Sequence, residues 1–161
     1  MSVKIFVAFL CAAIGTGLGF TVSRLYAKTS KYYLSVLELI TELKRNIAYR
    51  RDSVASVMKG FKAGSERLGT QIAEYLAFVS TKNGELKLSR GFLSSSSFSD
   101  IVGFFSSLGR ADGDGQEKDL DMYYKKFEAD YAAATEKSKK YGPLAIKLGF
   151  LFGLCLGILF L

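Results

Sequence analysis

The stretch LAIKLGFLFGLCLGILFL at residues 144–161 decides the fold, because it is apolar along its whole length except for Lys147. The other end of the chain has the same character, since VKIFVAFLCAAIGTGLGFTV at residues 3–22 carries only Lys4. A helix rises about 1.5 Å per residue and the hydrocarbon layer of a membrane is about 30 Å thick. Each end is therefore long enough to span a bilayer if its lysine extends toward the interface.

All the acidic residues lie between these two apolar ends. The sequence therefore predicts a transmembrane helix at residues 1–22, a polar domain at 23–142 and a second transmembrane helix at 143–161. Two other interpretations are a buried core helix at either end and a cleaved signal peptide at the first. A signal peptide would place small residues just before a polar region, whereas Ala12 and Ala13 lie inside the apolar run.

Basic residues flank the inner ends of both predicted spans. Lys and Arg are retained on the cytoplasmic side of a membrane, so the central domain is predicted to be cytoplasmic with both termini outside. The same charges favour contact with anionic lipid headgroups, and membrane lipid is a predicted partner. The flanking residues are Arg24, Lys28 and Lys31 after the first span, and Lys137, Lys139, Lys140 and Lys147 at the second.

Composition argues against several classes of function. The formal charge of +7 would suit a nucleic-acid-binding protein, but the charges gather near the spans and no recognition motif accompanies them. The chain has no His, the commonest general base and metal ligand. Cys11 and Cys155 both lie in the apolar ends and have no metal-ligand spacing. We therefore predict no catalytic residue, no metal site, no cofactor and no nucleic-acid partner.

The central region has the spacing of amphipathic helices throughout. Apolar residues recur three or four positions apart, and no stretch alternates for long enough to form a strand. This pattern predicts an all-α fold, an antiparallel bundle of about five to six helices flanked by the two transmembrane helices. The apolar faces run through residues 36–47, 54–61, 68–79, 98–108 and 120–141.

The last of these faces is the most regular, and it begins after a predicted helix start. Asp114 and Glu117 have the spacing of a capping box. The face could be a coiled-coil seam, but its several tyrosines favour a buried face of a bundle. Asp52 or Ser53 is expected to cap the helix that begins near residue 54.

The turn before the last helix is the first candidate site. Gly109 is predicted to end a helix in a left-handed conformation. Asp112, Asp114 and Gln116 would then present polar groups to a partner at the tip of the domain. Ordinary turn chemistry is the alternative. A calcium loop starting at Asp112 is disfavoured, because its sixth and twelfth positions lack the required Gly and Glu.

Glycines spaced four residues apart form the second candidate site. Small residues at this spacing allow helix backbones to approach closely in lipid. We expect the spans to pack on each other, or on a neighbouring subunit that could be a second copy of the chain. The alternative is that glycine is simply frequent in membrane helices. The residues are Gly15, Gly19, Gly149, Gly153 and Gly157.

Three segments in order along the chain resemble one family. Residues 105–116, FSSLGRADGDGQ, are similar to the Phe-x-x-Leu-Gly-x-x-Asp-x-x-x-Gln signature of stage III sporulation protein AB. Residues 43–49 resemble that family's Leu-x-x-Glu-Ile-x-Tyr helix, with Asn46 in place of the acidic residue. Residues 148–154, LGFLFGL, resemble its closing membrane segment. The family's Thr-Pro-Leu turn is replaced by residues 51–54, RDSV, so local contacts there can differ.

The resemblance implies a part in the channel-like complex that endospore-forming bacteria assemble around the developing spore. It implies a non-enzymatic platform subunit in the mother-cell membrane, the outer membrane around the forespore. Its cytoplasmic domain would be similar to that of the platform protein F of type II secretion and type IV pili. A cytoplasmic secretion-type ATPase and other membrane subunits of the channel would be its partners. The alternatives are a membrane-anchored adaptor or sensor of another complex, and a membrane-bound enzyme, which the lack of His disfavours.

Overall fold

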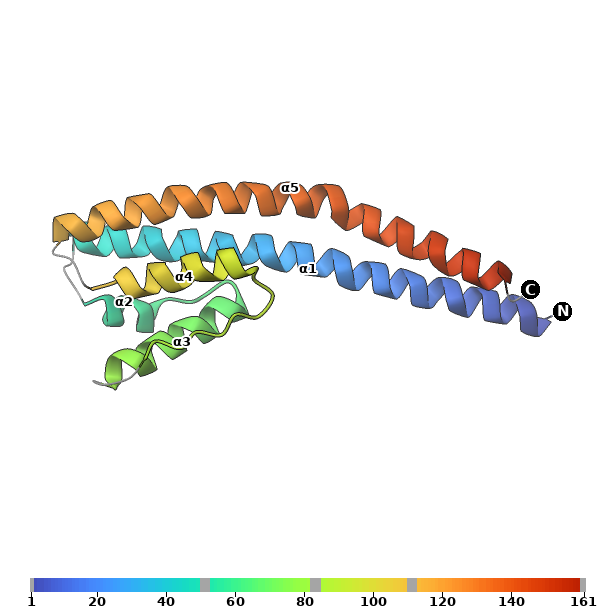
Figure 1. Cartoon of the computed structure of the whole chain (residues 1–161), viewed down its shortest axis with the longest axis horizontal. Helices are drawn as coiled ribbons and strands as arrows, with labels where there is room; N and C mark the ends of the chain where they lie inside the picture. Colours follow the sequence, from blue (N-terminus) through green and yellow to red (C-terminus); the bar gives the residue numbers. More distant parts are fainter. Residues whose placement is uncertain (1, 50–52, 82–84, 110–112, 160–161) are drawn as a thin grey trace. The chain divides into compact units, whose positions relative to one another are not determined.

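The computed structural model describes residues 2–49, 53–81, 85–109 and 113–159, and these form five helices and no strand (Figure 1). The all-α fold predicted from the helical spacing is therefore confirmed. The helices are α1 (Ser2–Tyr49), α2 (Val54–Gly60), α3 (Glu66–Ser80), α4 (Ser95–Ser107) and α5 (Gly113–Leu159).

The two long helices differ from the predicted division into separate spans and domain helices. Helix α1 contains both the first apolar end and the first predicted domain helix, and α5 contains both the last domain helix and the second apolar end. Residues 23–32 contain neither Gly nor Pro, so nothing there ends a helix. Pro143 lies inside α5, where it removes one backbone hydrogen bond without ending the helix.

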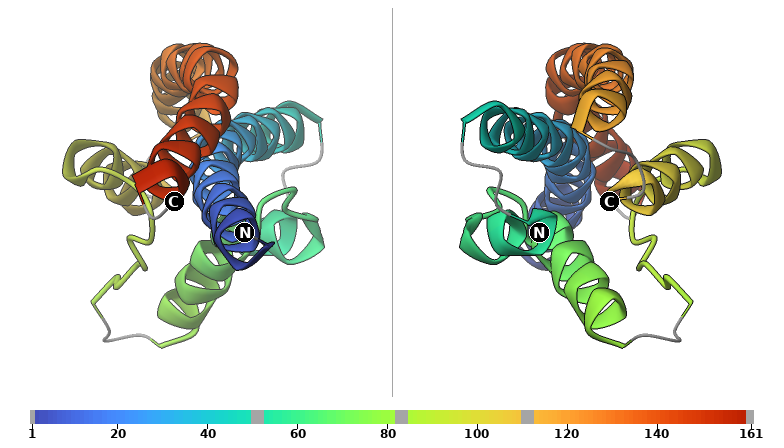
Figure 2. Two further views of the ribbon diagram at one scale, coloured as in Figure 1. Left: turned by 90° about the vertical axis from the view of Figure 1, so that its right-hand side faces the viewer. Right: turned by 90° about the vertical axis from the view of Figure 1, so that its left-hand side faces the viewer.

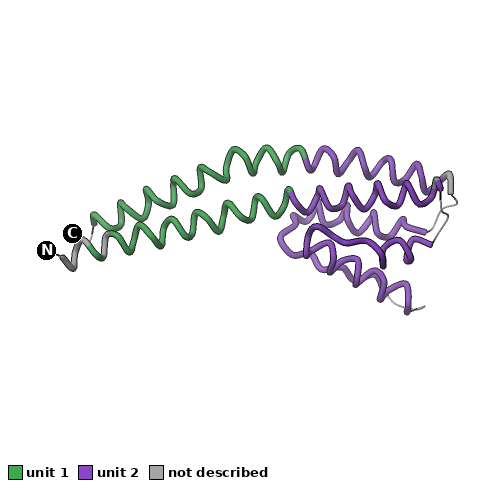
Figure 3. Tube along the Cα trace, turned by 180° about the vertical axis from the view of Figure 1, so that it is seen from behind, with its two compact units in different colours: residues 1–30, 132–161 green, residues 31–131 purple. Residues whose placement is uncertain are grey.

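The chain divides into two compact units, coloured separately in Figure 3. Unit 1 comprises residues 1–30 and 132–161, and unit 2 comprises residues 31–131. This division reflects where residues cluster and does not locate a membrane surface. The boundaries at residues 22 and 142 therefore remain a prediction.

Helix α1 is buried on two sides within unit 2. The adjacent residues Tyr32 and Tyr33 are 0% and 3% exposed, and they face different helices. Tyr32 donates a hydrogen bond to Gln71 of α3, whereas the ring of Tyr33 lies 6.3 Å from that of Phe127 on α5. In unit 2, α1 accordingly lies between α5 and α3, as the end-on views of Figure 2 also show.

Aromatic rings connect the helices of the unit 2 core. Phe104 of α4 is fully buried and contacts Phe127 of α5 edge to face, with ring centroids 5.9 Å apart. Phe105, the next residue, lies 5.5 Å from Tyr75 of α3. Offset and edge-to-face pairs of this kind add to the stabilisation that burial of the rings provides. The core therefore fixes α3, α4 and α5 relative to one another within unit 2.

Serine side chains cap two of the short helices. Ser53 accepts a hydrogen bond from the backbone N–H of Ser56 at the start of α2, as predicted, and Ser94 accepts one from Ser97 at the start of α4. Asp52, the other predicted cap, lies outside the described residues. Helix α5 begins at Gly113, so Asp114 is its second residue rather than the residue before its first, and the predicted capping box is out of register by two residues.

Unit 1 consists of the N-terminal part of α1 and the C-terminal part of α5, which run antiparallel. Most of its large apolar side chains are exposed, including Phe9 at 79%, Phe152 at 65% and Leu159 at 80%. A core helix of a soluble protein would be mostly buried, whereas only 17% of the apolar window in each helix is buried. The chain therefore has two candidate membrane-spanning helices, which indicates association with a membrane.

Candidate functional site

A buried amide holds the irregular segment of residues 85–93 against α3. Gln71 is 0% exposed, and the oxygen and the nitrogen of its side-chain amide each form a hydrogen bond. Its oxygen accepts from the hydroxyl of Tyr32 at 2.6 Å, and its nitrogen donates to the backbone oxygen of Ser89 at 3.0 Å. Burial raises the pKa of the Tyr32 hydroxyl, so this group stays a neutral donor at physiological pH.

The same segment has one further attachment to α3 and one side-chain bond within itself. The carboxylate of Glu74 accepts from the backbone N–H of Ser89 at 2.7 Å and also from its hydroxyl. Arg90 donates through Nε to the backbone oxygen of Leu93 at 2.9 Å. Between them Gly91 has a φ of +60°, a left-handed conformation that favours glycine. The bonds to Gln71 and Glu74 therefore hold the segment against α3 at Ser89.

Acidic and basic side chains of α1, α4 and α5 meet on the surface of unit 2. Lys126 pairs with Asp100 at 2.6 Å, and Lys44 pairs with Asp121 at 2.5 Å. Asp130 is half-buried, and burial, with a smaller contribution from the negative charge of Asp100, raises its pKa above the ordinary value of 3.8. The exposed ion pairs contribute little to stability. Ionisation of the Asp130 carboxyl, in contrast, slightly destabilises the folded state.

We expect Asp130→Asn to stabilise the protein at neutral pH and to have little effect below pH 3.8. Because the folded-state pKa is raised, folding favours the protonated carboxyl, and this stabilisation is lost as pH rises from 3.8 through the raised pKa. At neutral pH the substitution should raise the free energy of unfolding by less than about 1 kcal/mol, since the group is largely solvated. Thermal denaturation of the full chain in mild detergent at both pH values measures the difference.

Glu128→Gln is the matched control, because it neutralises an exposed carboxylate on the same helix. It should change the melting temperature by much less. An equal gain for Asp130→Asn at acidic and neutral pH would show that ionisation is not the cause.

The turn predicted to face a partner is partly described. Gly109 has a φ of +74°, as predicted for a left-handed residue after α4, and it is exposed. Asp112 lies outside the described residues, and Asp114 lies in the first turn of α5 with its side chain undescribed. Gln116 is half-buried in α5. The structure thus places two of the four residues, and the partner-binding role stays a prediction.

Gly109 and Gln116 both line a groove of about 840 Å³ in unit 2. The groove lies between the start of α2, the second half of α3, residues 85 and 86, and the end of α4. Among the described residues that line it, Glu85 is the only charged one. Its apolar lining includes Tyr75, Phe78, Val79, Leu86, Phe105 and Leu108.

The sequence predicted the turn but not the groove. Spacing places Tyr75, Phe105 and Leu108 on predicted helix faces. Spacing alone does not distinguish a face buried in the core from one that lines a groove. Glu85 lies between the predicted helix faces at residues 68–79 and 98–108 and belongs to no periodic pattern. No signal in the sequence therefore marks it as part of a site. Only the fold brings Glu85 and Gln116 to one groove.

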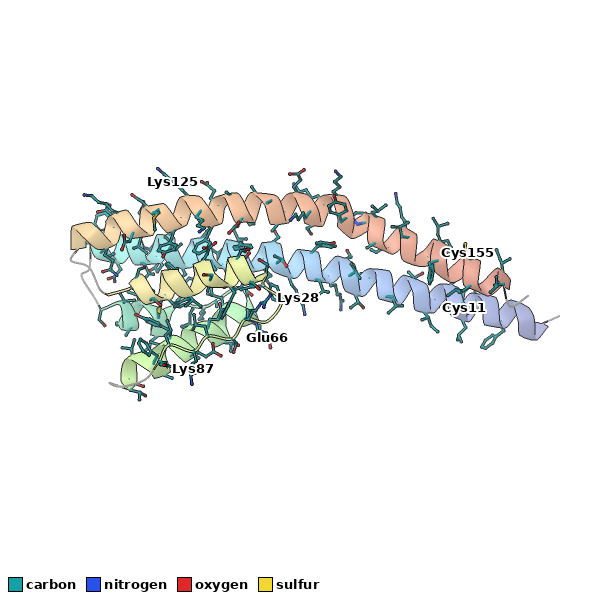
Figure 4. The ribbon with its side chains drawn as sticks, viewed as in Figure 1. Cys11, Lys28, Glu66, Lys87, Lys125 and Cys155 are labelled. Atoms are coloured by element: carbon teal, nitrogen blue, oxygen red, sulfur yellow. The ribbon has the colours of Figure 1, made fainter. Side chains whose placement is uncertain are left out.

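Metal-ligand chemistry finds no support in the part of the chain that the structure describes. There, no group of three or more Cys, Asp or Glu residues is arranged to hold a metal ion. Asp112, where the disfavoured calcium loop would begin, lies outside that part. Cys11 and Cys155 are both free thiols of unit 1 (Figure 4).

The predicted glycine residues bring the two helices of unit 1 into backbone contact. A Cβ added to Gly15 would lie 3.0 Å from the Cα of Gly153, and one added to Gly19 would lie 2.9 Å from the Cα of Ile146. A Cβ on Gly149 would lie 3.2 Å from the Cα of Gly19. Gly157 is buried. The geometry is that of small residues at a close crossing of membrane helices.

Basic and aromatic side chains follow the apolar part of unit 1. The guanidinium of Arg24 lies 4.5 Å from the ring centroid of Phe20, and the ammonium of Lys140 lies 5.6 Å from that of Tyr141. Tyr26 and Tyr141 pair across the two helices at 6.1 Å. Lys28, labelled in Figure 4, is exposed near them. Aromatic rings beside Lys and Arg are typical of a membrane interface.

Fold and site together define an all-α protein with two candidate membrane-spanning helices and a small helical unit. The family model for stage III sporulation protein AB matches residues 4–161. The chain therefore belongs to the stage III sporulation protein AB family, as the resemblance predicted, and membership supports a role in stage III of sporulation. This is not a known enzyme family. Neither the curated proteins nor the solved structures gave a match.

Proposed function

We propose that this protein is a non-enzymatic platform subunit of the secretion-like channel complex around the forespore. The observation that carries the proposal is the family match over residues 4–161, together with two apolar helix ends that bracket a helical unit. A chain anchored at both ends is suited to hold its central region at a fixed place on a membrane. The likeness to secretion platform protein F belongs to this proposal.

In this proposal the central region faces the mother-cell cytoplasm, and the spans lie in the outer forespore membrane. The support is the position of the basic residues, because Arg24, Lys28 and Lys140 are all exposed beside the inner ends of the apolar segments. Positive charge at this position favours retention on the cytoplasmic side. Anionic lipid would add to the attachment.

The proposed partners are a cytoplasmic secretion-type ATPase and the other membrane subunits of the channel. The turn from Gly109 to Gln116 is the proposed contact surface. Support comes from the exposed position of Gly109 and from the groove that it shares with Gln116. Asp112 and Asp114 are included in this surface because they lie between Gly109 and Gln116 in the sequence.

The test is purification of the tagged full chain from membranes of sporulating cells. We expect the ATPase and other channel subunits to be recovered with it, and we expect the double change Asp112→Ala and Gln116→Ala to reduce ATPase recovery. Because the ATPase is cytoplasmic, its recovery from intact membranes also tests which side the central region faces.

The double variant must keep the melting temperature of the parent chain for this comparison to be made. Glu128→Ala serves as a surface control on α5 and should leave recovery unchanged. Recovery of membrane subunits of an unrelated complex, with no ATPase, would favour the adaptor interpretation. Normal spore yield from cells lacking the chain would overturn the proposal.

A further inference from the structure

The groove in unit 2 has a floor of tightly packed apolar side chains. Tyr75, Phe105 and Leu108 are 5%, 1% and 6% exposed, and the rings of Tyr75 and Phe105 lie 5.5 Å apart. Val79 on the wall is 46% exposed. These three side chains are held by the core, so the apolar surface that an occupant can reach is that of Phe78, Val79 and Leu86. A volume of about 840 Å³ falls within the range of roughly 300–1,000 Å³ that is typical of small binding pockets.

Two polar groups at this groove have no partner among the described residues. The side-chain nitrogen of Gln116 is buried and makes no hydrogen bond there. A buried donor without an acceptor is unfavourable, and an occupant that supplies a carbonyl oxygen would relieve it. Glu85 is exposed and makes no ion pair within the described part of the chain. The groove thus presents one free donor and one negative charge beside an apolar floor.

These features distinguish between occupants. An anionic lipid headgroup would be repelled by Glu85, and an acidic peptide would be repelled for the same reason. A peptide segment supplies what the groove lacks, since its backbone has carbonyl oxygens and its side chains can be apolar and basic. Lys87, two residues after Glu85 and labelled in Figure 4, is not among the described residues that line the groove.

We propose that this groove binds a short apolar segment of a partner protein that carries a Lys or Arg beside its apolar side chains. The apolar side chains lie on Phe78, Val79 and Leu86, and the basic group pairs with Glu85. The amide of Gln116 turns toward the groove and donates to a backbone carbonyl of the segment. This recognition is of the anchor-in-groove kind, in which pockets give affinity and a charge selects the partner. The inference rests on the proposed function, because it assigns a chemistry to the surface through which the platform would bind.

The test uses the full chain in nanodiscs of phosphatidylcholine, so that no anionic lipid captures the probe. Two fluorescein-labelled peptides serve as probes, each with Leu and Phe one helical turn apart, and they differ only in a flanking Lys or Glu. Fluorescence anisotropy should show that the Lys peptide binds about two- to fivefold more tightly, the range expected of an exposed ion pair. Glu85→Lys should abolish or reverse this preference.

Glu128→Lys is the matched control, because it makes the same charge change at an exposed position on α5 outside the groove. Glu128→Lys should retain the parent chain's preference for the Lys peptide. Both variants should keep the parent's melting temperature. Equal affinity for the two peptides, or a preference that Glu85→Lys does not alter, would overturn the inference. Self-association of the chain that Glu85→Lys abolishes would also overturn it, by making a second copy the occupant.

The outcomes separate this inference from the proposed function. Equal affinity of the parent chain for the two peptides, with intact ATPase recovery, would leave the platform role standing and refute only the groove chemistry. Failure of the parent chain to recover the ATPase would refute the platform role, whatever the peptides do.

Discussion

Replacing Gly153 by Leu is expected to break the packing of the two helices in unit 1 without preventing membrane insertion. A Cβ at this position would lie 2.8 Å from the Cα of Ala12, and it would also meet the backbone oxygen of Cys11. Backbone atoms cannot move aside as a flexible side chain can, so the helices must separate. Overpacking of this kind costs about 2–3 kcal/mol, and the lost backbone contacts add to that cost.

The measurement is the mole fraction of sodium dodecyl sulfate that unfolds the full chain in mixed micelles, and Gly153→Leu should lower it. Gly17→Leu is the matched control, since Gly17 is exposed and a Cβ there meets nothing within 4 Å. Both variants should stay in the membrane after alkaline extraction. If Gly17→Leu and Gly153→Leu had the same effect, close packing would not be the reason.

Replacing Gln71 by Leu is expected to be the most damaging single change in unit 2. Leucine is close in size, but it leaves the hydroxyl of Tyr32 and the backbone oxygen of Ser89 without their partner. Each buried group left unpaired costs about 1–3 kcal/mol, so we expect a loss of about 2–4 kcal/mol. Urea unfolding of the full chain in mild detergent, followed by near-ultraviolet circular dichroism of the aromatic residues, measures it.

A double-mutant cycle identifies the cause. Tyr32→Phe removes the hydroxyl, so adding it to Gln71→Leu should cost much less than it costs alone. Thr70→Val, at the neighbouring exposed position of α3, should have little effect because it removes only a solvent-exposed bond to Glu66. Strict additivity of Tyr32→Phe and Gln71→Leu would show that the hydrogen bond contributes nothing.

Helix faces were the part of this fold that spacing could predict. Leu120, Phe127 and Ala134 are buried along α5 as the seam predicted. Phe104 is buried as well, three residues after Ile101 and four before Leu108, so it belongs to the same helical stripe of α4.

The polar core, in contrast, was not predictable. Gln71 lies three residues after Leu68, so spacing alone places it on the buried face of α3. Its partner Ser89, however, belongs to a segment of irregular backbone, and no periodicity indicates what such a segment touches. The groove was not predictable for the same reason, because its charged residue Glu85 begins that segment.

The burial of Tyr32 and Tyr33 on different sides of α1 has a consequence for how unit 2 can move. Successive residues of an α-helix point about 100° apart, so the two rings pack against different helices. Turning α1 about its own axis would pull Tyr32 away from Gln71 and Tyr33 away from Phe127 at once. Rotation of α1 within this unit is therefore opposed by contacts on both of its buried sides. We expect any rearrangement of unit 2 to keep this helix in its present rotational setting.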